Sequence, residues 1–299
     1  MRSRITRYFR DSLDFLLFSN IFIALCSVAQ ALVTYHLLDV RPEKHILALL
    51  FFSTVAQYNF SILLIKPANP QKSSFRRVRW IFSHYRLMIS ITIISILSLI
   101  PLILFLSVPS QILLFFLGVL GIGYGLPIFS FHDKKFGLRN IPGIKLFLIA
   151  LVWSLSTVLL PILDLESTGA LHTPNRDTIL LIAKRFLFIA AITVPFDIRD
   201  LFQDKSSALK TIPVMLGEKK AYLFCQALLF AYVILLFLFS ESFDRNFIAL
   251  SLTIILSGWL IFKSNFVRNE YYYFLYLDGT MILQFLMLFL ANLIPVTLW

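Results

Sequence analysis

Charged residues are scarce in this chain, and their scarcity excludes an ordinary soluble domain. Only 14% of the 299 residues are charged, whereas 59% are hydrophobic and phenylalanine alone occurs 31 times. In a soluble globular domain about a quarter of the residues are charged. A membrane-spanning helix needs about 20 mostly apolar residues, and the sequence contains many such windows. We therefore predict an integral membrane protein.

Cysteine is also rare, which excludes a disulfide framework or a cysteine-based metal site. The two cysteines, Cys26 and Cys225, both lie inside apolar runs, where cysteine behaves as a small buried hydrophobe. The net charge of +11 would suit nucleic acid, but no soluble domain is present to carry a basic face. Basic residues in a membrane protein more often set its orientation. We expect no nucleic-acid partner.

The apolar runs predict an all-α protein with nine transmembrane helices. They fall near residues 13–38, 44–65, 85–107, 110–130, 142–163, 177–198, 220–240, 246–263 and 273–297. The first run is much longer than the apolar part of a signal peptide, which has about 7–15 residues, so we interpret it as the first span. We find no repeat of fixed period, no low-complexity tract and no soluble extension. We expect a single transmembrane domain over residues 1–299.

Lysine and arginine predict the orientation of these spans. With the N-terminus in the cytoplasm, 21 of the 27 basic residues fall on the inner side, including the long links 66–84, 131–141 and 199–219. This excess predicts a cytoplasmic N-terminus and an outer C-terminus, and we expect a bacterial inner membrane location. Lys184 and Arg185 lie inside the sixth span. They either reach the outer surface or pair with an acid such as Asp164 or Asp177.

Three aspartates follow directly on an apolar run, in the stretch FDIRDLFQDKSSALKTIPVMLG (196–217). The spacing of Asp197, Asp200 and Asp204 would place them on one face of a helix that leaves the membrane. Like charges that close repel, so something positive should sit among them. Mg²⁺ takes carboxylate and phosphate oxygens, and it would suit a substrate with a diphosphate head and a hydrocarbon tail. The alternative is a solvated helix end with ordinary polar residues.

This stretch resembles the second aspartate motif of the UbiA-type prenyltransferase superfamily. The three aspartates match the carboxylates of the motif, Thr211 to Pro213 match the turn after them, and Gly217 matches the last glycine. Ala208 stands where the family usually has glycine. Nine helices with a cytoplasmic N-terminus also match, and YGLPIF (124–129) with a downstream basic residue is similar to a family feature.

The resemblance implies a bundle of nine helices around a central cavity that opens sideways to lipid. In this family, metal ions held by two aspartate motifs bind a prenyl diphosphate. Ionisation then gives an allylic cation that a hydrophobic or aromatic acceptor captures. By the resemblance, Mg²⁺ would bind at Asp197, Asp200 and Asp204. The diphosphate end would be formed by Asn59, Lys66, Tyr124, Arg139 and Lys205.

The chain departs from the family at the first aspartate motif, N-D-x-x-D-x-x-x-D at the end of the second span. The corresponding stretch AQYNFSILLIKPANP (56–70) keeps only Asn59, and no carboxylate occurs between Glu43 and Asp133. In one interpretation a single Mg²⁺ remains, and cations replace the other metal by direct phosphate contact. Candidates for this role are Lys66, Arg76, Arg77 and Arg139.

In the other interpretation the protein is catalytically silent and binds a lipid or a membrane partner. We favour the enzyme, a prenyltransferase that acts on a prenyl diphosphate and a hydrophobic or aromatic acceptor. Asp278, just inside the last span, is either a hydrogen-bonding residue of the bundle or a distant member of the site. A transporter is less expected, because no pair of broken spans appears in matching halves.

Overall fold

The computed structural model describes residues 2–64, 67, 69–125, 129–131, 134–136, 141, 143–206, 209–240, 243–265 and 267–293. Its helices are α1 (Arg2–Phe18), α2 (Ile21–Leu37), α3 (Lys44–Leu64), α4 (Arg76–Ser83), α5 (Tyr85–Leu104), α6 (Val108–Gly125), α7 (Ile144–Ser154), α8 (Leu160–Ser167), α9 (Asn175–Arg199), α10 (Leu201–Ser206), α11 (Ile212–Leu216), α12 (Glu218–Leu238), α13 (Arg245–Lys263) and α14 (Gly279–Leu293). A 3₁₀ turn, η1 (Pro70–Lys72), and two π-helical turns, η3 (Leu155–Leu159) and η4 (Tyr272–Leu277), complete the helical part.

Seven of the nine predicted spans fall on long apolar helices, and the chain is a multi-pass integral membrane protein. Within the described residues, seven helices are long and apolar enough to cross a bilayer. These are Lys44–Leu64, Tyr85–Leu104, Ile144–Ser167, Asn175–Arg199, Glu218–Leu238, Arg245–Lys263 and Tyr272–Leu293. The first predicted span is a bent helix pair, and the fourth is the shorter apolar helix Val108–Tyr124. The count of nine crossings stays a prediction.

The first predicted span is not one continuous helix. Helices α1 and α2 meet at an angle of 61°, and Asn20 between them has the left-handed backbone conformation (φ 67°). Asparagine tolerates this conformation better than most residues, because its short side chain can make local hydrogen bonds. The break turns the Asn20 side chain, which is 1% exposed, into the bundle.

The fourth predicted span, 110–130, ends earlier than expected. Helix α6 stops at Gly125, and strand β1 (Phe129–Phe131) pairs antiparallel with strand β2 (Lys134–Phe136). A helix usually ends before a proline, and Pro127 follows two residues later. The hairpin is short, and the rest of the described secondary structure is helical, as expected of an all-α protein.

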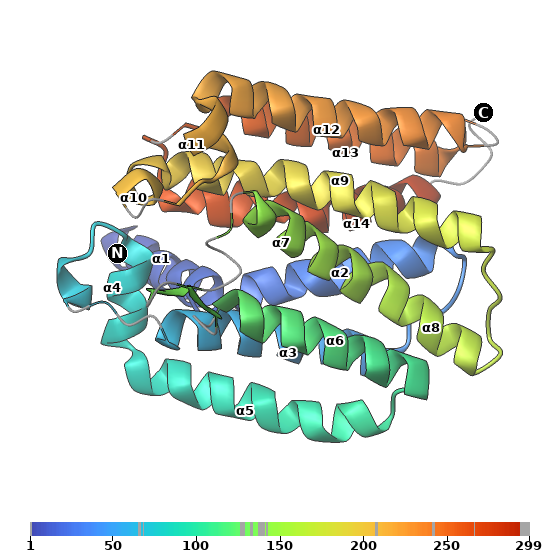
Figure 1. Cartoon of the computed structure of the whole chain (residues 1–299), viewed down its shortest axis with the longest axis horizontal. Helices are drawn as coiled ribbons and strands as arrows, with labels where there is room; N and C mark the ends of the chain where they lie inside the picture. Colours follow the sequence, from blue (N-terminus) through green and yellow to red (C-terminus); the bar gives the residue numbers. More distant parts are fainter. Residues whose placement is uncertain are drawn as a thin grey trace.

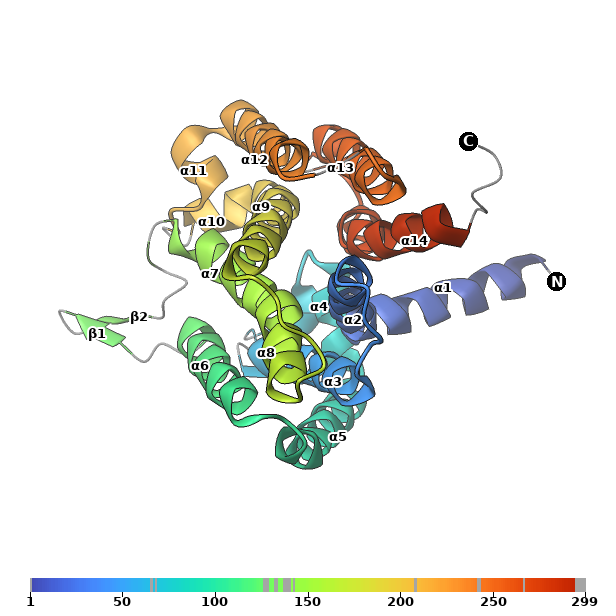
Figure 2. The ribbon, with the colours of Figure 1, turned by 90° about the vertical axis from the view of Figure 1, so that its right-hand side faces the viewer.

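The long helices form a bundle in which neighbours in sequence are mostly neighbours in space (Figure 1). Contacts join α2 to α3, α3 to α5, α6 to α7, α7 to α9, α9 to α12, α12 to α13 and α13 to α14. Helix α14 then packs against α2 (Figure 2). The two ends of the polypeptide are therefore brought together, and residues from both halves can line one pocket.

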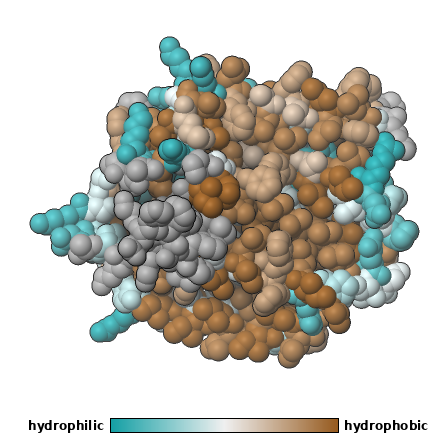
Figure 3. Space-filling view, viewed as in Figure 1, coloured by the Kyte–Doolittle hydropathy of each residue, from teal (hydrophilic) through white to brown (hydrophobic). Residues whose placement is uncertain are grey.

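The short elements gather at one end of the bundle. Helices α4, α10 and α11 and the hairpin all lie toward the left end of the bundle in Figure 1. They belong to the three long links that the charge pattern places on one side of the membrane. Hydrophobic residues cover the middle of the surface, and hydrophilic ones cluster toward its two ends (Figure 3). This distribution is that of a bilayer-spanning protein, with an apolar belt between two polar ends.

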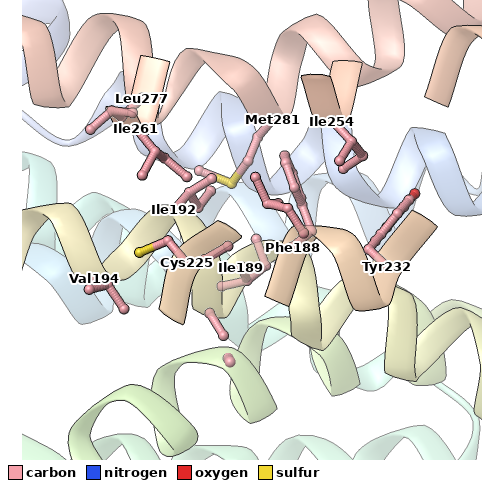
Figure 4. Close-up of a cluster of buried hydrophobic side chains, with 14 of the residues drawn as sticks. Phe188, Ile189, Ile192, Val194, Cys225, Tyr232, Ile254, Ile261, Leu277 and Met281 are labelled. Atoms are coloured by element: carbon pink, nitrogen blue, oxygen red, sulfur yellow. The ribbon is translucent and has the colours of Figure 1, made fainter. Parts of the chain in front are cut away.

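The main core lies where α9 packs against α12, α13 and α14. Helix α9 contributes Phe188, Ile189 and Ile192 to this core (Figure 4). The other helices contribute Cys225 and Tyr232 from α12, Ile254 and Ile261 from α13, and Met281 from α14. A side chain of this size stabilises the fold by roughly 1.5–3 kcal/mol in water. In lipid such contacts stabilise through close packing instead. The core fixes α9, the helix whose last turn carries Asp197 and Arg199.

Candidate functional site

A pocket of about 300 Å³ opens among the helices near the end of the bundle that holds α4 and α10. Its wall is largely apolar and includes Leu17, Ile23, Ile149, Trp153, Ile189 and Met281. Its polar part contains the cations Arg77, Lys145 and Arg199 and the carboxylates Asp197 and Asp278. A cavity of this size, mostly apolar with a few convergent polar groups, is the usual form of a small-molecule site.

Lys145 and Asp197 form an ion pair at the pocket. The Nζ atom of Lys145 lies 2.5 Å from Oδ1 of Asp197, and the Asp197 side chain is 2% exposed against 24% for Lys145. Helix α7, which carries Lys145, begins after Gly143, a glycine with positive φ (73°). The Gly143 N–H donates to the carbonyl of Lys210 at 3.3 Å. The start of α7 is thereby fastened to the link after the aspartate motif.

The other two aspartates also have partners within the chain. Arg199 donates to both carboxylate oxygens of Asp200, at 2.7 Å and 2.9 Å. Asp204 is 6% exposed and accepts a hydrogen bond from the Thr211 hydroxyl at 3.2 Å. The positive charge expected among the aspartates is therefore supplied by Lys145 and Arg199. Lys145 is also within electrostatic range of Asp204.

These carboxylates do not form a magnesium site in the arrangement described. Among the described residues, no three His, Cys, Asp or Glu side chains come close enough together to hold a metal ion. Mg²⁺ requires oxygen ligands that converge on one centre. Here the Asp197 carboxylate is bonded to the lysine ammonium, which is also within electrostatic range of Asp204. The expected magnesium role of Asp197, Asp200 and Asp204 stays a prediction.

Two guanidinium groups approach the pocket from different elements and meet on one aromatic ring. The central carbon of Arg77 lies 4.6 Å from the centroid of Phe274, and that of Arg199 lies 5.2 Å from the same centroid. Arg77 also donates to the Asn20 side-chain oxygen. The Nε of Arg77 and the Nη1 of Arg199 are buried and have no hydrogen-bond partner. Each of these two pocket-lining arginines thus carries one buried donor without a partner.

Helix α4 holds Arg77 in this position. The carboxylate of Glu270 accepts the backbone N–H groups of Arg76 and Arg77, at 2.6 Å and 3.0 Å, at the start of the helix. A carboxylate there also complements the helix dipole. The Arg76 side chain turns away and pairs with Asp14. Burial, with Arg199 nearby as a second cause, lowers the pKa of Arg77 to about 10, so Arg77 is still charged at neutral pH.

Asp278 reaches the pocket from the last predicted span. It follows the π-helical turn η4, and its N–H donates to the Tyr273 carbonyl at 3.1 Å. Such a turn inserts one extra residue and rotates the remainder of the helix, a distortion that is frequent at functional sites. Asp278 lines the pocket, and Arg77 and Arg199 are both within electrostatic range of its carboxylate. The open question about Asp278 is thus answered in part, because it lies at the pocket.

The structure places the residues expected at the diphosphate end in different surroundings. Asn59 is 0% exposed and accepts a hydrogen bond from Asn20 at 2.6 Å, one layer behind the pocket wall. Tyr124, in the last turn of α6, is half-buried and within electrostatic range of Lys145. Lys205 is exposed and does not line the pocket. Lys66, Arg139 and the substituted motif position Ala208 lie outside the described residues.

Sequence reasoning missed the importance of Asn20 and Lys145. Asn20 could have been noticed as a polar residue within a long apolar run. Lys145 gave no such signal, because its partner Asp197 is 52 residues away in sequence. Arg77 was named only as one of several cations, and the structure selects it from the described ones, since Arg76 points to Asp14.

Arg185 belongs to a second polar cluster, away from the pocket. It is 5% exposed and donates to the carbonyl of Gln30 at 2.6 Å and to the hydroxyls of Thr34 and Thr157 at 3.2 Å each. Reaching the outer surface is therefore not its role. None of its hydrogen bonds in the described part of the chain goes to an acid. Asp164, the suggested partner, is bonded to His45 at 2.7 Å.

The fold is that of UbiA homologues. A UbiA homolog from Archaeoglobus fulgidus bound to GPP and Mg²⁺ matches with a TM-score of 0.65 and 14% identity, covering 94% of this chain and 100% of that one. The same homolog bound to DMAPP and Mg²⁺ matches with a TM-score of 0.62, 15% identity and the same coverage. The apo UbiA homolog from Aeropyrum pernix K1 matches with a TM-score of 0.64 and 15% identity, over 91% and 98% of the two chains. No protein-family model matches the sequence, and neither does any curated protein at a significant level.

Proposed function

We propose that this chain is a divergent member of the UbiA-type superfamily, a single-domain membrane protein that binds a prenyl diphosphate and transfers its prenyl chain to a hydrophobic or aromatic acceptor. The observation that carries the proposal is the pocket, which joins a largely apolar wall to three cations at one end. A diphosphate with a hydrocarbon tail has the complementary distribution of charge. The UbiA homologues of the same fold that bind GPP and DMAPP support this choice of substrate.

The reaction needs the carbon–oxygen bond of the prenyl diphosphate to break. The bonding electrons leave with the diphosphate, and the remaining allylic cation forms a new bond to the acceptor, which then loses a proton. Cationic groups at the leaving diphosphate stabilise the charge that develops there. Arg77, Lys145 and Arg199 are placed to do this. The apolar wall would keep water from the cation, since water would otherwise capture it.

Magnesium remains part of the proposal as an expectation from the sequence. Asp197, Asp200 and Asp204 would be its ligands, and structures of the A. fulgidus homolog with bound Mg²⁺ and Cd²⁺ support divalent metal use in this fold. A bound magnesium ion would neutralise the leaving diphosphate. Our proposal also retains a cytoplasmic N-terminus, an outer C-terminus and a bacterial inner membrane.

One observation favours a second candidate, a catalytically silent protein that binds a lipid or a membrane partner. The described residues contain no cluster able to hold a metal, and no carboxylate lies where the first aspartate motif is expected. A phosphorylated lipid could then bind in the pocket without reacting.

Purified protein in detergent, given radiolabelled GPP and a panel of aromatic and polyprenyl acceptors, separates the two functions. The enzyme releases pyrophosphate in step with a labelled, more hydrophobic product. The binder retains unreacted GPP, and this outcome would overturn the transferase proposal. The informative variants are Asp204→Asn and Arg77→Gln, once thermal melting has shown that both are folded. An enzyme of the proposed kind loses turnover in at least one of them.

A further inference from the structure

The described pocket contains three cationic side chains, and a diphosphate head needs positive charge of this kind. Arg77, Lys145 and Arg199 come from α4, α7 and α9, three elements that the bundle brings together. Two carboxylates, Asp197 and Asp278, line the same pocket. Asp197 is bonded to Lys145, whereas Asp278 is within electrostatic range of both arginines. The charges are therefore arranged as an anion site with its own counter-ions.

The arginine pair has the geometry of a preorganised phosphate site. The central carbons of the Arg77 and Arg199 guanidinium groups lie 4.6 Å and 5.2 Å from the Phe274 ring centroid. A cation within about 6 Å of a ring centroid is attracted to the ring face. Each retains one buried donor without a partner, Nε on Arg77 and Nη1 on Arg199. Buried donors are nearly always satisfied, so an unsatisfied one needs an explanation. A phosphate oxygen at each donor would provide it.

Lys145 is bonded to one of the carboxylates that the sequence assigns to a metal. Its ammonium group is bonded to Asp197 and is within electrostatic range of Asp204. A lysine ammonium is a compact point charge that binds phosphate well. Its contact with Asp197 leaves room for further bonds, because an ammonium group has three donors. The ion pair with Asp197 thus holds the lysine at the pocket without using up its donors.

We propose that the chain binds the diphosphate head of its substrate directly through Arg77, Arg199 and Lys145, without a divalent cation, and that Asp278 competes with that diphosphate for the two arginines. This inference rests on the proposed function, because it names the way in which the same pocket recognises its substrate. It differs from the expectation of the sequence, in which Asp197, Asp200 and Asp204 bind the substrate through magnesium.

The test is binding, measured by calorimetry on the full chain in detergent, with GPP and with inorganic pyrophosphate as probes. We expect the dissociation constant to change less than about threefold between excess Mg²⁺ and excess EDTA. Arg77→Gln should weaken GPP binding by roughly tenfold or more, the effect of losing one charge-assisted hydrogen bond. Arg79→Gln is the matched control, because it makes the same charge change on the same helix while Arg79 donates to the carbonyls of Ser73 and Ser74, away from the pocket.

Variants of the two carboxylates distinguish direct binding of the head by the arginines from binding through a metal. If the arginines bind the head directly, Asp278→Asn removes a competing charge and tightens GPP binding several-fold. Asp197→Asn then leaves binding unchanged or tighter, since Lys145 is released. If a metal binds the head, Asp197→Asn abolishes binding. Thermal melting with and without pyrophosphate identifies any variant that does not fold, and Arg77→Lys, which keeps the charge, then replaces Arg77→Gln and should weaken binding less.

The inference is overturned if EDTA abolishes GPP binding, or if Asp197→Asn abolishes it while Arg77→Gln has no effect. Transfer of the prenyl chain with EDTA-sensitive binding would leave the proposed function standing and remove the inference. EDTA-resistant binding without transfer of the prenyl chain would leave the inference standing and remove the proposed transferase function. Failure of GPP and pyrophosphate to bind under any condition would remove both.

Discussion

The ion pair between Lys145 and Asp197 gives a quantitative test of the pocket's construction. Removing one partner of a buried pair typically costs about 3–5 kcal/mol, because the remaining charge is left uncompensated. The two partners differ in exposure, with 24% for the Lys145 side chain and 2% for Asp197. A stranded Lys145 can therefore regain water more easily than a stranded Asp197. Lys145→Met should be the costlier change, at about 3 kcal/mol, against about 2 kcal/mol for Asp197→Asn.

The double variant should recover much of this loss. With both charges removed, neither group is left unpaired, and the pair Lys145→Met with Asp197→Asn should cost only about 1–2 kcal/mol in total. The interaction energy from the cycle is then about 3–4 kcal/mol, at or just above the usual range for residues in contact. Unfolding free energies can be obtained by titrating the purified protein from mild detergent into SDS. A coupling below about 0.5 kcal/mol, or a larger cost for Asp197→Asn than for Lys145→Met, would refute this reasoning.

The packing at Gly121 and the pKa of Arg77 give two further predictions. A Cβ at Gly121 would lie 3.1 Å from the Gln57 side chain, which donates to the Gly121 carbonyl, whereas a Cβ at Gly118 on the same helix meets nothing within 4 Å. By SDS titration, Gly118→Ala should be more stable than Gly121→Ala by about 1 kcal/mol or more, and equal stabilities would contradict the contact. The second concerns pH: burial lowers the pKa of Arg77 to about 10, with Arg199, Asp278, Tyr58 and Glu270 as the charged or titratable groups around it. Above that pH the folded chain binds fewer protons than the unfolded chain, so the Arg77 contribution to stability rises while pyrophosphate affinity falls. Affinities measured from about pH 8 to about pH 11 check the fall, and Arg77→Gln should not show it.

The membrane architecture could be predicted from the sequence because the bilayer imposes a strong and simple constraint. Each span must be a run of about 20 apolar residues with its backbone hydrogen bonds satisfied internally. Seven of the expected runs accordingly fall on helices long enough to cross a bilayer, and the short helices of two of the links rich in Lys and Arg, α4, α10 and α11, lie at one end of the bundle. The break at Asn20 escaped this reasoning, because one residue with positive φ changes no average over an apolar window.

The aspartate stretch was recognised, but its surroundings were not predictable. Asp197 and Asp204 are both buried, but they lie in two helices, α9 and α10, with Asp200 at the break between them. Their partners are determined by tertiary packing, since Lys145 comes from α7 and the guanidinium of Arg77 from α4. A helical wheel contains no information about such distant residues. It was also uninformative about Arg199, which folds back onto the neighbouring Asp200.

The central claim is that the pocket holds a diphosphate head at the two arginines and a hydrocarbon tail against the apolar wall. An experimental structure of the chain with bound GPP, prepared in EDTA, tests it most directly. We expect phosphate oxygens at about 2.7–2.9 Å from Arg77 Nε and Arg199 Nη1, with the tail passing Ile189 and Trp153. A head group seen only in the presence of Mg²⁺, bridged by the metal to Asp197 and Asp204 and away from Arg77, would contradict the account.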